Sequence, residues 1–450
     1  MLFKNFKITN IVAYEVIDSR GYPTVACDVY VGKIKAKSMV PSGASTGQKE
    51  AIELRDNDKL RYNGKGVLNA VKNVNEIIKP KLIGMDCRNQ KEIDQLMIDI
   101  DGTPNKANLG ANAILSVSLS VAKIAAIISQ KPLYRYISEN ILNENRSEYI
   151  MPVPMLNVIN GGAHADNTID FQEFMFMPVG AKSIKEAVRV ASECFHALQS
   201  ILKSKGFNTN KGDEGGFAPN LKSSDEALTL MVDAIKKAGY RSGIDKDVAI
   251  ALDPATSELY NSEKKVYVFK KAIDAKILSV ANGTKTSEQM VNYWDDVSKK
   301  YPIISIEDGL AENDWNGFKL QVTKMGNRVQ IVGDDLICTN PAIAKEAISN
   351  KLANSILIKV NQIGTLSETI ETIKLAQNAG WTAVVSHRSG ETEDTTIADI
   401  AVGMNTGQIK TGSMSRSERI AKYNRLIEIE NELGLKAIYK GIYSFYNLQK

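Results

Sequence analysis

The chain has 450 residues, of which 43% are hydrophobic and 24% are charged. This size and composition are typical of a well-packed globular protein with room for a barrel and one further domain. Lys and Arg together number 56 and Asp and Glu 52, so the net charge is +4. The two signs are interspersed along the chain, which argues against nucleic acid as the main partner.

The cysteines and the N-terminus bear on the compartment. The four cysteines are far apart and form no C-x-x-C pair, so the sequence indicates neither a zinc site nor a disulfide framework. The segment from Met1 to Ile8 lacks the apolar stretch of a secretory signal. We therefore expect a cytoplasmic location.

The first part of the chain predicts strands followed by helices. Strand-like segments separated by turn residues lie at 8–17, 24–31 and 34–40, and segments with helical periodicity at 65–83, 90–100 and 109–129. This order predicts an α+β domain over residues 1–140, with a linker at 139–149. The apolar 109–129 segment contains Asn112, Lys123 and four serines, so we expect a buried helix and no membrane span.

From residue 151 onward, strand-like and helix-like segments alternate, with helices expected at 183–204 and 223–239. A run of about 300 residues with this rhythm suits one barrel with insertions. The predicted fold class is therefore α/β: a TIM-type (β/α)8 barrel over residues 150–450, with residues 1–140 as an N-terminal α+β capping domain.

Five apolar segments in the second half each end in a residue able to do chemistry. Successive gaps between these residues are 54, 27, 25 and 28, and the residues are Asp253, Glu307, Asp334, Lys359 and the pair His387–Arg388. A βα unit occupies about that much chain, because the return helix must span the sheet before the next strand. The spacing therefore places all five at the same end of one barrel, where such folds carry their active sites.

The three acids in this set are oxygen donors of the kind that Mg²⁺ prefers. The alternative is that strand-end acids cap the following helices, and it weakens when three lie in register. Lys359 lies in an apolar strand, where a lysine must either find a partner or lose its proton, unless it is an ordinary lysine that reaches solvent from the strand end. Next to a bound divalent metal its pKa would fall, since like charges ~4 Å apart repel by roughly 4 kcal/mol at a dielectric of ~20.

Glycine-rich loops add further candidates. Residues 160–164 carry His164, residues 211–216 carry Glu214, and residues 40–47 predict a flexible lid that carries Ser45. The lid lacks the G-x-x-x-x-G-K-[ST] order of a phosphate loop, which argues against nucleotide binding. Lys410, with Arg388 and Ser389, is a candidate anion-binding group.

Eleven motifs occur in an order that resembles the enolase (phosphopyruvate hydratase) family, in its bacterial form. They run from about residue 10 to residue 440 and include Asp-Ser-Arg-Gly (18–21), Pro-Ser-Gly-Ala-Ser-Thr-Gly (41–47), Gly-Asp-Glu-Gly-Gly (212–216), Ser-Ile-Glu-Asp-Gly-Leu (305–310), Lys-Val-Asn-Gln-Ile-Gly (359–364) and Ser-His-Arg-Ser-Gly-Glu-Thr (386–392).

The resemblance implies reversible dehydration of 2-phospho-D-glycerate to phosphoenolpyruvate in glycolysis and gluconeogenesis, with two Mg²⁺ ions stabilising an enolate-like intermediate. It implies Lys359 as the general base and Glu214 as the general acid, with Glu173 and His164 nearby. The implied metal ligands are Asp253, Glu307, Asp334 and Ser45, and the implied substrate-binding residues are Gln172, Glu173, His164, Lys359, His387, Arg388, Ser389 and Lys410.

Departures from the family pattern concern assembly. Ala26 and Glu428 stand where most members have a Glu and an Arg that pair between subunits, so that ion pair is in doubt while a homodimer or higher homo-oligomer is still expected. Two alternative functions stay open. One is an additional surface-displayed or secreted role in binding host plasminogen through the terminal Lys450, and the other is enolisation of a different carboxylate substrate.

Overall fold

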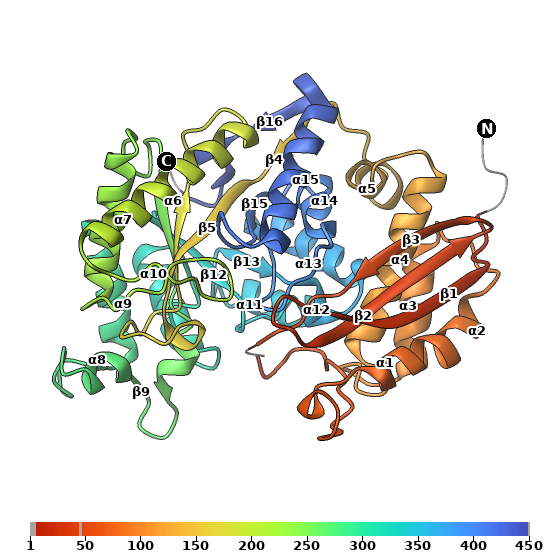
Figure 1. The fold of residues 1–450 in the computed structure, drawn as a ribbon, viewed down its shortest axis with the longest axis horizontal. Helices are drawn as coiled ribbons and strands as arrows, with labels where there is room; N and C mark the ends of the chain where they lie inside the picture. Colours follow the sequence, from red (N-terminus) through yellow and green to blue (C-terminus); the bar gives the residue numbers. More distant parts are fainter. Residues whose placement is uncertain (1–5, 45–46, 449–450) are drawn as a thin grey trace.

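The computed structural model describes residues 6–44 and 47–448, except for the side chain of His164. In Figure 1 a sheet with flanking helices, built from the first third of the chain, lies beside a barrel built from the rest. The predicted metal ligand Ser45 and the terminal Lys450 lie outside the described residues. The plasminogen-binding role therefore stays a prediction.

The N-terminal sheet is antiparallel, in the order β1 (Asn10–Ile17), β2 (Pro23–Val31) and β3 (Ile34–Met39). These strands confirm the three predicted segments to within two residues. The residue pair of β2 and β3 nearest the turn is Val31 with Ile34, so the loop between the strands has two residues. Gly32 has a φ of 61° there, the positive value that such a tight hairpin loop requires.

The helices of this region cover one side of the sheet (Figure 1). They are α1 (Leu68–Lys72), α2 (Lys79–Leu82), α3 (Gln90–Asp101), α4 (Ala111–Ile128) and α5 (Leu133–Tyr136). The predicted 65–83 helix is interrupted by a π-helical turn over Asn73–Ile78. Within that turn, Asn75 bonds both the N–H and the carbonyl of Ala13 at 2.9 Å, and so caps the exposed edge of β1.

Helix α4 is long and apolar enough to pass a membrane-span test, yet 89% of its residues are buried inside the protein. It packs against β2 and β3, and Ser120 Oγ donates to the carbonyl of Cys27 at 2.7 Å. Its apolar surface and its serines are therefore both satisfied by protein contacts, which confirms the expected buried helix.

Eight strands close the barrel, and β15 pairs with β5 to complete it. They are β5 (Val153–Asn160), β6 (Glu173–Met177), β7 (Ala249–Asp253), β11 (Ile303–Glu307), β12 (Gln330–Gly333), β13 (Ser355–Ile358), β14 (Thr382–Ser386) and β15 (Gly407–Lys410). The longer helices around it are α6 (Ile184–Ser204), α7 (Ser224–Lys237), α9 (Ser287–Lys300), α10 (Trp315–Met325), α11 (Pro341–Ser349), α13 (Leu366–Asn378), α14 (Thr396–Gly403) and α15 (Ser417–Leu433). The predicted closed α/β barrel is confirmed.

Two details differ from a regular repeat of βα units. Strand β6 runs antiparallel to both neighbours, because residues 161–172 connect it to β5 without a long return helix. The long gap between Asp253 and Glu307 holds a small three-stranded sheet, formed by β8 (Tyr260–Asn261), β9 (Val266–Val268) and β10 (Thr284–Lys285), together with the short helix α8 (Lys270–Asp274). That gap is an insertion and adds no barrel strand.

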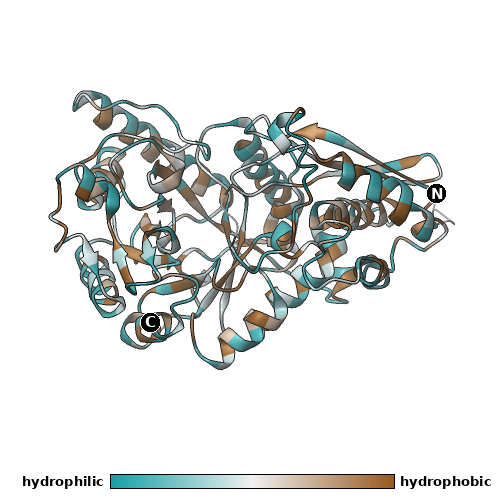
Figure 2. Ribbon diagram, turned by 90° about the horizontal axis from the view of Figure 1, so that it is seen from below, coloured by the Kyte–Doolittle hydropathy of each residue, from teal (hydrophilic) through white to brown (hydrophobic). Residues whose placement is uncertain are grey.

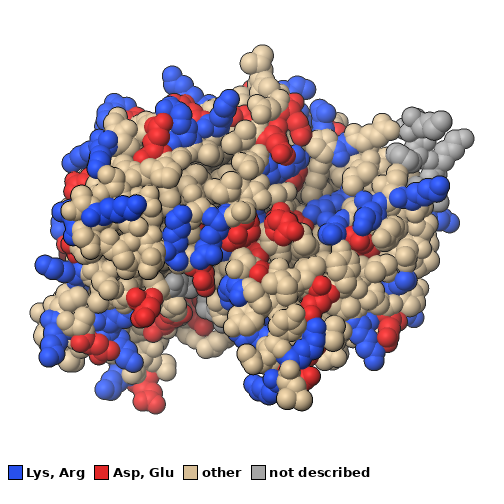
Figure 3. All heavy atoms as spheres, in the orientation of Figure 1, with Lys and Arg blue, Asp and Glu red and all other residues tan. Residues whose placement is uncertain are grey.

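The barrel has two apolar layers, one inside the strands and one between the strands and the helices. The inner cluster includes Met155, Met175, Ala251, Ile304 and Leu357, while the outer cluster packs the helices onto the barrel. The surface helices in Figure 2 show brown and teal bands, as expected of helices with one apolar face. On the face drawn in Figure 3, basic and acidic side chains are interspersed, in line with the mixed charge of the sequence.

Candidate active site

The strand-end residues meet at one mouth of the barrel, as their spacing predicts. Asp253, Glu307 and Lys410 are the last residues of β7, β11 and β15, whereas Asp334 and Lys359 directly follow β12 and β13. All but Glu307 line one small cavity, and Glu307 bonds to Lys410 in its wall. The other residues around this cavity are Gln172, Glu173, Glu214, Ala255, Asp308, Asp335, Ser386, His387, Arg388 and Ser389.

Glu173 lies at the same mouth because its strand, β6, runs antiparallel to its neighbours. It begins β6, and its register partner is Asp253 at the end of β7. An antiparallel neighbour places its first residue beside the last residue of the next strand. A spacing argument that assumes parallel strands would place Glu173 at the far end, whereas the reversed β6 brings it to the mouth.

Lys410 lies buried among three acids. Its Nζ is 2.7 Å from Asp253 Oδ2, 2.8 Å from Glu307 Oε1 and 3.3 Å from Glu173 Oε1. Burial favours the neutral amine, but these carboxylates outweigh it, so the pKa of Lys410 is raised. Burial together with the Asp253 charge raises the pKa of Glu307, and burial together with the Glu214 charge raises that of Glu173.

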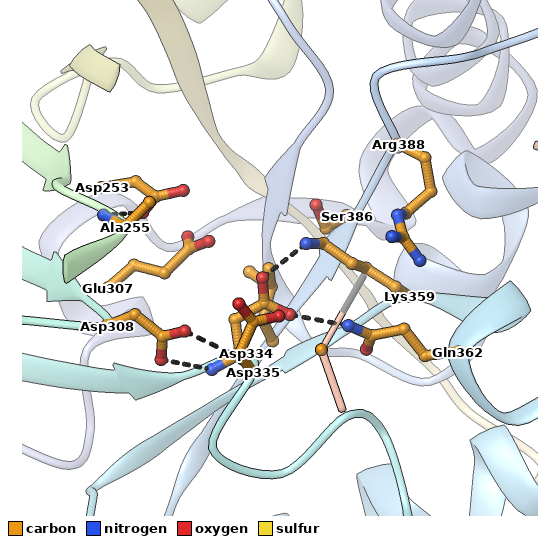
Figure 4. Close-up of polar contacts among 12 residues, drawn as sticks. Asp253, Ala255, Glu307, Asp308, Asp334, Asp335, Lys359, Gln362, Ser386 and Arg388 are labelled. Carbon is orange, nitrogen blue, oxygen red and sulfur yellow. Dashed lines mark hydrogen bonds and ion pairs between the residues drawn. The ribbon is translucent and has the colours of Figure 1, made fainter. Parts of the chain in front are cut away.

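Lys359 pairs with Asp334 rather than with the first group of acids. Its Nζ donates to Asp334 Oδ2, and Gln362 Nε2 donates to Asp334 Oδ1 at 2.9 Å (Figure 4). Burial opposes charge on both partners, but their mutual attraction outweighs it, so the pKa of Asp334 is lowered and that of Lys359 is raised. The lowered pKa predicted for Lys359 depends on a bound metal ion and stays a prediction.

A second acidic group borders Asp334. One oxygen each of Asp308, Asp334 and Asp335 lie within 4.8 Å of one another. Asp308 accepts hydrogen bonds from the backbone N–H groups of the other two at 2.9 Å. Burial, followed by the Asp334 charge, raises the pKa of Asp335 to about 7. Sequence reasoning missed Asp308 and Asp335, although the acidic doublets Glu307–Asp308 and Asp334–Asp335 could have indicated them.

The mouth suits a hard cation. Of the residues that the structure describes, six acidic and three cationic side chains line its cavity. Among the described residues, Oε2 of Glu173 and Oε2 of Glu307 are buried without a hydrogen-bond partner. Excess buried carboxylate with raised pKa values is the condition that added positive charge relieves. The donors are all oxygens, which favours Mg²⁺ over a softer metal.

Glu214 faces the mouth from the loop before α7. Its Oε2 accepts from Asn157 Nδ2 at 2.9 Å, and its Oε1 lies 3.8 Å from His387 Nε2. The loop needs its glycine at position 215, where φ is 90° and a Cβ would come within 2.5 Å of Ser415 Oγ. The glycine-rich motif therefore allows the close approach that brings Glu214 into the site.

Arg388 and His387 follow β14, and both are buried. Arg388 forms two hydrogen bonds with Glu50, at 2.9 and 3.2 Å. Burial lowers the pKa of His387 well below its usual value, so the imidazole is neutral at pH 7. Gln172 lines the cavity, and His164 ends the short turn Gly162–His164, eight residues earlier in the chain.

Cavity size alone does not mark this site. A much larger cavity, about 710 Å³, lies between α7, α9 and the segment that carries α8. Two of its charged side chains already have partners: Asp225 pairs with Lys300 at 2.7 Å, and Lys285 lies over the ring of Phe269. The barrel mouth, with its converging buried charges, is the candidate active site.

Comparison with family models decides the relationship. The model described as "Enolase, N-terminal domain" matches residues 8–137, and the model described as "Enolase, C-terminal TIM barrel domain" matches residues 148–448. The chain belongs to the enolase family. The predicted family, the lyase class and the phosphopyruvate hydratase activity are therefore confirmed.

Curated relatives are similar over essentially the whole chain. The enolase of Malacoplasma penetrans is 72% identical over 450 residues, which is 100% of both chains. The enolase of Mycoplasmoides gallisepticum is 61% identical over 98% of this chain and 93% of its own. The enolase of Mycoplasma pneumoniae is also 61% identical, over 99% of this chain and 97% of its own. This full-length similarity sets aside the alternative of a different carboxylate-enolising enzyme.

Proposed function

We propose that Lys359 and Glu214 carry the two proton transfers of the enolase reaction in this chain. That reaction is the reversible dehydration of 2-phospho-D-glycerate to phosphoenolpyruvate, and membership of the family assigns it to this protein. The difficult step removes a weakly acidic proton beside a carboxylate that is already negative. Lys359 is the proposed base and Glu214 the proposed acid, and both line the same cavity.

The surroundings of these two groups support the assignment. Lys359 is held by Asp334, which fixes the position of its Nζ. Glu214 is held by Asn157. Two groups that exchange protons with opposite sides of a substrate must be separately anchored, because small displacements lower the rate steeply. Glu173, which borders Glu214 and Lys410, and His164 are proposed to assist from the loop side.

The enolase family generally uses Mg²⁺, and we propose that this chain does so with two ions per site. When bound, the ions supply positive charge that stabilises negative charge on the substrate carboxylate. Asp253, Glu307 and Asp334 are the proposed ligands of the first ion, and Ser45 of the second. The unpartnered oxygen of Glu307 and the excess of buried acids support this role.

The remaining cationic and polar groups are proposed to bind the substrate. Arg388 and Ser389 would hold the phosphate, because a guanidinium fork matches phosphate oxygens. Lys410 would face the carboxylate, with Gln172 and His387 as further contacts. These five residues line one cavity with Lys359, and that convergence is the observation that carries the proposal.

The direct test is formation of phosphoenolpyruvate from 2-phosphoglycerate, followed by its ultraviolet absorbance with and without Mg²⁺. We expect activity only with the metal. Activity that persists undiminished after the metal is chelated would contradict the proposed use of the acids.

Domain division, assembly and location are also proposals. A boundary between residues 140 and 150 is supported by family-model matches that end at 137 and begin at 148. Cytoplasmic location is supported by four free, buried cysteines. We propose a homodimer or larger homo-oligomer, although Glu428 pairs with Arg425 of its own chain at 3.3 Å and Ala26 is buried. Molar mass in solution, compared with 49.4 kDa for one chain, tests the assembly.

A further inference from the structure

Glu50 and Arg388 form a buried, two-pronged ion pair across the molecule. Arg388 Nη1 lies 2.9 Å from Glu50 Oε2, and Arg388 Nη2 lies 3.2 Å from Glu50 Oε1. The two side chains are only 6% and 3% exposed. A carboxylate that meets both prongs of a guanidinium fixes the plane of the guanidinium as well as its position. Glu50 therefore sets the orientation of Arg388.

The same carboxylate also reaches the group that holds the proposed base. Gln362 Nε2 donates to Glu50 Oε1 at 3.3 Å and to Asp334 Oδ1 at 2.9 Å. Gln362 Oε1 accepts from Thr339 Oγ1 at 2.8 Å, so its amide nitrogen must face the two carboxylates. Asp334 in turn accepts from Lys359 Nζ. One continuous set of hydrogen bonds thus joins Arg388 to Lys359 through Glu50.

Glu50 is itself held in place. Its Oε1 accepts from the backbone N–H of Gly47 at 3.1 Å, and its own N–H donates to the carbonyl of Gly47 at 3.1 Å. The next residue, Ala51, donates from its backbone to the carbonyl of Gln362 at 2.8 Å. The backbone of Glu50 and of the next residue is thus held by hydrogen bonds. Glu50 is therefore preorganised and can align Arg388 and Gln362 at little entropic cost.

We infer that Glu50 is a positioning residue of the active site. It aligns Arg388 for a phosphate group and, through Gln362, aligns Asp334 and Lys359. One residue of the N-terminal region thus holds the phosphate subsite and the base in fixed relative positions. This inference rests on the proposed role of Arg388 in phosphate binding. The opposite possibility is that Glu50 competes with phosphate for Arg388, in which case its removal would strengthen phosphate binding.

The experiment compares Glu50→Gln and Glu50→Asp with Glu53→Gln, measuring kcat, KM and competitive inhibition by inorganic phosphate. Glu53 is a control in the same segment, since its ion pair is with Arg55 and its charge acts on Arg388 only as a minor contribution after Glu50 and Asp334. We expect both Glu50 variants to raise KM and the phosphate inhibition constant by about tenfold, because catalytic sites lose activity steeply with small displacements. The control variant is expected to stay within about twofold.

The Glu50→Asp variant keeps the negative charge, so that a loss of function in it is not caused by an unpaired buried Arg388. Thermal unfolding of each variant shows whether it is folded. A Glu50 variant that unfolds earlier but binds phosphate normally would overturn the inference in favour of a purely structural role. Tighter phosphate binding would also overturn it, in favour of competition.

Combination with Arg388→Lys separates this inference from the proposed function. If Glu50 acts through Arg388, Glu50→Gln should add less than about twofold to the phosphate inhibition constant of an Arg388→Lys protein. A full tenfold further loss would overturn the inference. If Arg388→Lys itself leaves phosphate inhibition unchanged, the proposed role of Arg388 fails, and the inference about Glu50 fails with it.

Discussion

Arg419 Nη1 lies 2.7 Å from Nδ1 of His387, and both side chains are buried. Arginine has no acceptor, so Nδ1 must accept and the proton of the neutral imidazole resides on Nε2. Burial, reinforced by the Arg419 charge and opposed by Glu214, keeps the pKa of His387 low. The Nε2–H therefore faces Glu214, whose Oε1 is 3.8 Å away. The contact with Arg419 therefore fixes the tautomer of His387, which lies next to the proposed acid Glu214.

Replacement of Arg419 should damage catalysis although Arg419 is not one of the residues that line the cavity. Arg419 also donates to the carbonyls of Arg388 and Ser389 at 2.6 Å, so Arg419→Met releases three groups of the site at once. We expect kcat/KM to fall by about a hundredfold. Steady-state assays of phosphoenolpyruvate formation would measure this. Arg425→Met is the control on the same helix, and an equal loss there would contradict a specific role for Arg419.

Lys359→Ala should remove the proposed base while leaving the fold intact. We expect kcat to drop by about 10²–10⁴-fold, the usual contribution of a positioned proton-transfer group. Lys345→Ala, at an exposed position of α11 with only a long contact to Glu371, should retain full activity. Full activity in a well-folded Lys359→Ala protein would remove Lys359 from the role of base.

Mg²⁺ should stabilise the folded protein, because it relieves the repulsion among buried acids. At about a hundredfold excess over Kd the expected gain is ~2.7 kcal/mol, visible as a higher Tm than in EDTA. Asp334→Asn should abolish the gain, since Asp334 belongs both to the predicted ligand set and to the cluster with Asp308 and Asp335.

Two further variants distinguish the ligand set taken from the family resemblance from the cluster of Asp308, Asp334 and Asp335. If Asp253 is a ligand, Asp253→Asn should reduce the Mg²⁺-induced rise in Tm more than Asp335→Asn does. The reverse order would assign the ion to the Asp308, Asp334 and Asp335 cluster, and it would correct the ligand set taken from the family resemblance.

Asp394 should make the stability of the protein depend on pH in the acidic range. Its carboxylate accepts from Lys123 Nζ of α4 at 2.7 Å and from the N–H of Met39 at 3.0 Å. Burial opposes the charge, but Lys123 outweighs it and the pKa of Asp394 is lowered. Its stabilisation is therefore present above the unfolded value, about 3.9, and lost as the pH falls through the folded pKa.

Asp394→Asn is accordingly expected to lower the free energy of unfolding by ~1.5–3 kcal/mol at pH 7, the usual contribution of a hydrogen bond to a charged group. Urea unfolding at pH 7 and below pH 4 would measure the difference between variant and parent. That difference should shrink at the lower pH. A deficit of the same size at both values would show that the carboxylate charge is not responsible.

Much of this protein could be predicted from local pattern. Strand and helix periodicity is a property of neighbouring residues, so the N-terminal strands, α4 and the barrel strands were predictable. Even spacing then placed Asp253, Glu307, Asp334 and Lys359 at one mouth, because each βα unit of a parallel barrel returns the chain to the same end. The antiparallel direction of β6 could not be predicted from this spacing, because strand direction depends on whether the connection before the strand crosses the sheet.

The sequence by itself thus determined the family, the barrel and the candidate residues that we propose for the chemistry. Only the tertiary structure decided their pairing: Lys410 among Asp253, Glu307 and Glu173, Lys359 on Asp334, Arg419 on His387, and Glu50 on Arg388. The physical reason is that a buried charge must find a partner wherever the folded chain supplies one. Partners from distant segments, such as Glu50 and Arg388, leave no local signal in the sequence.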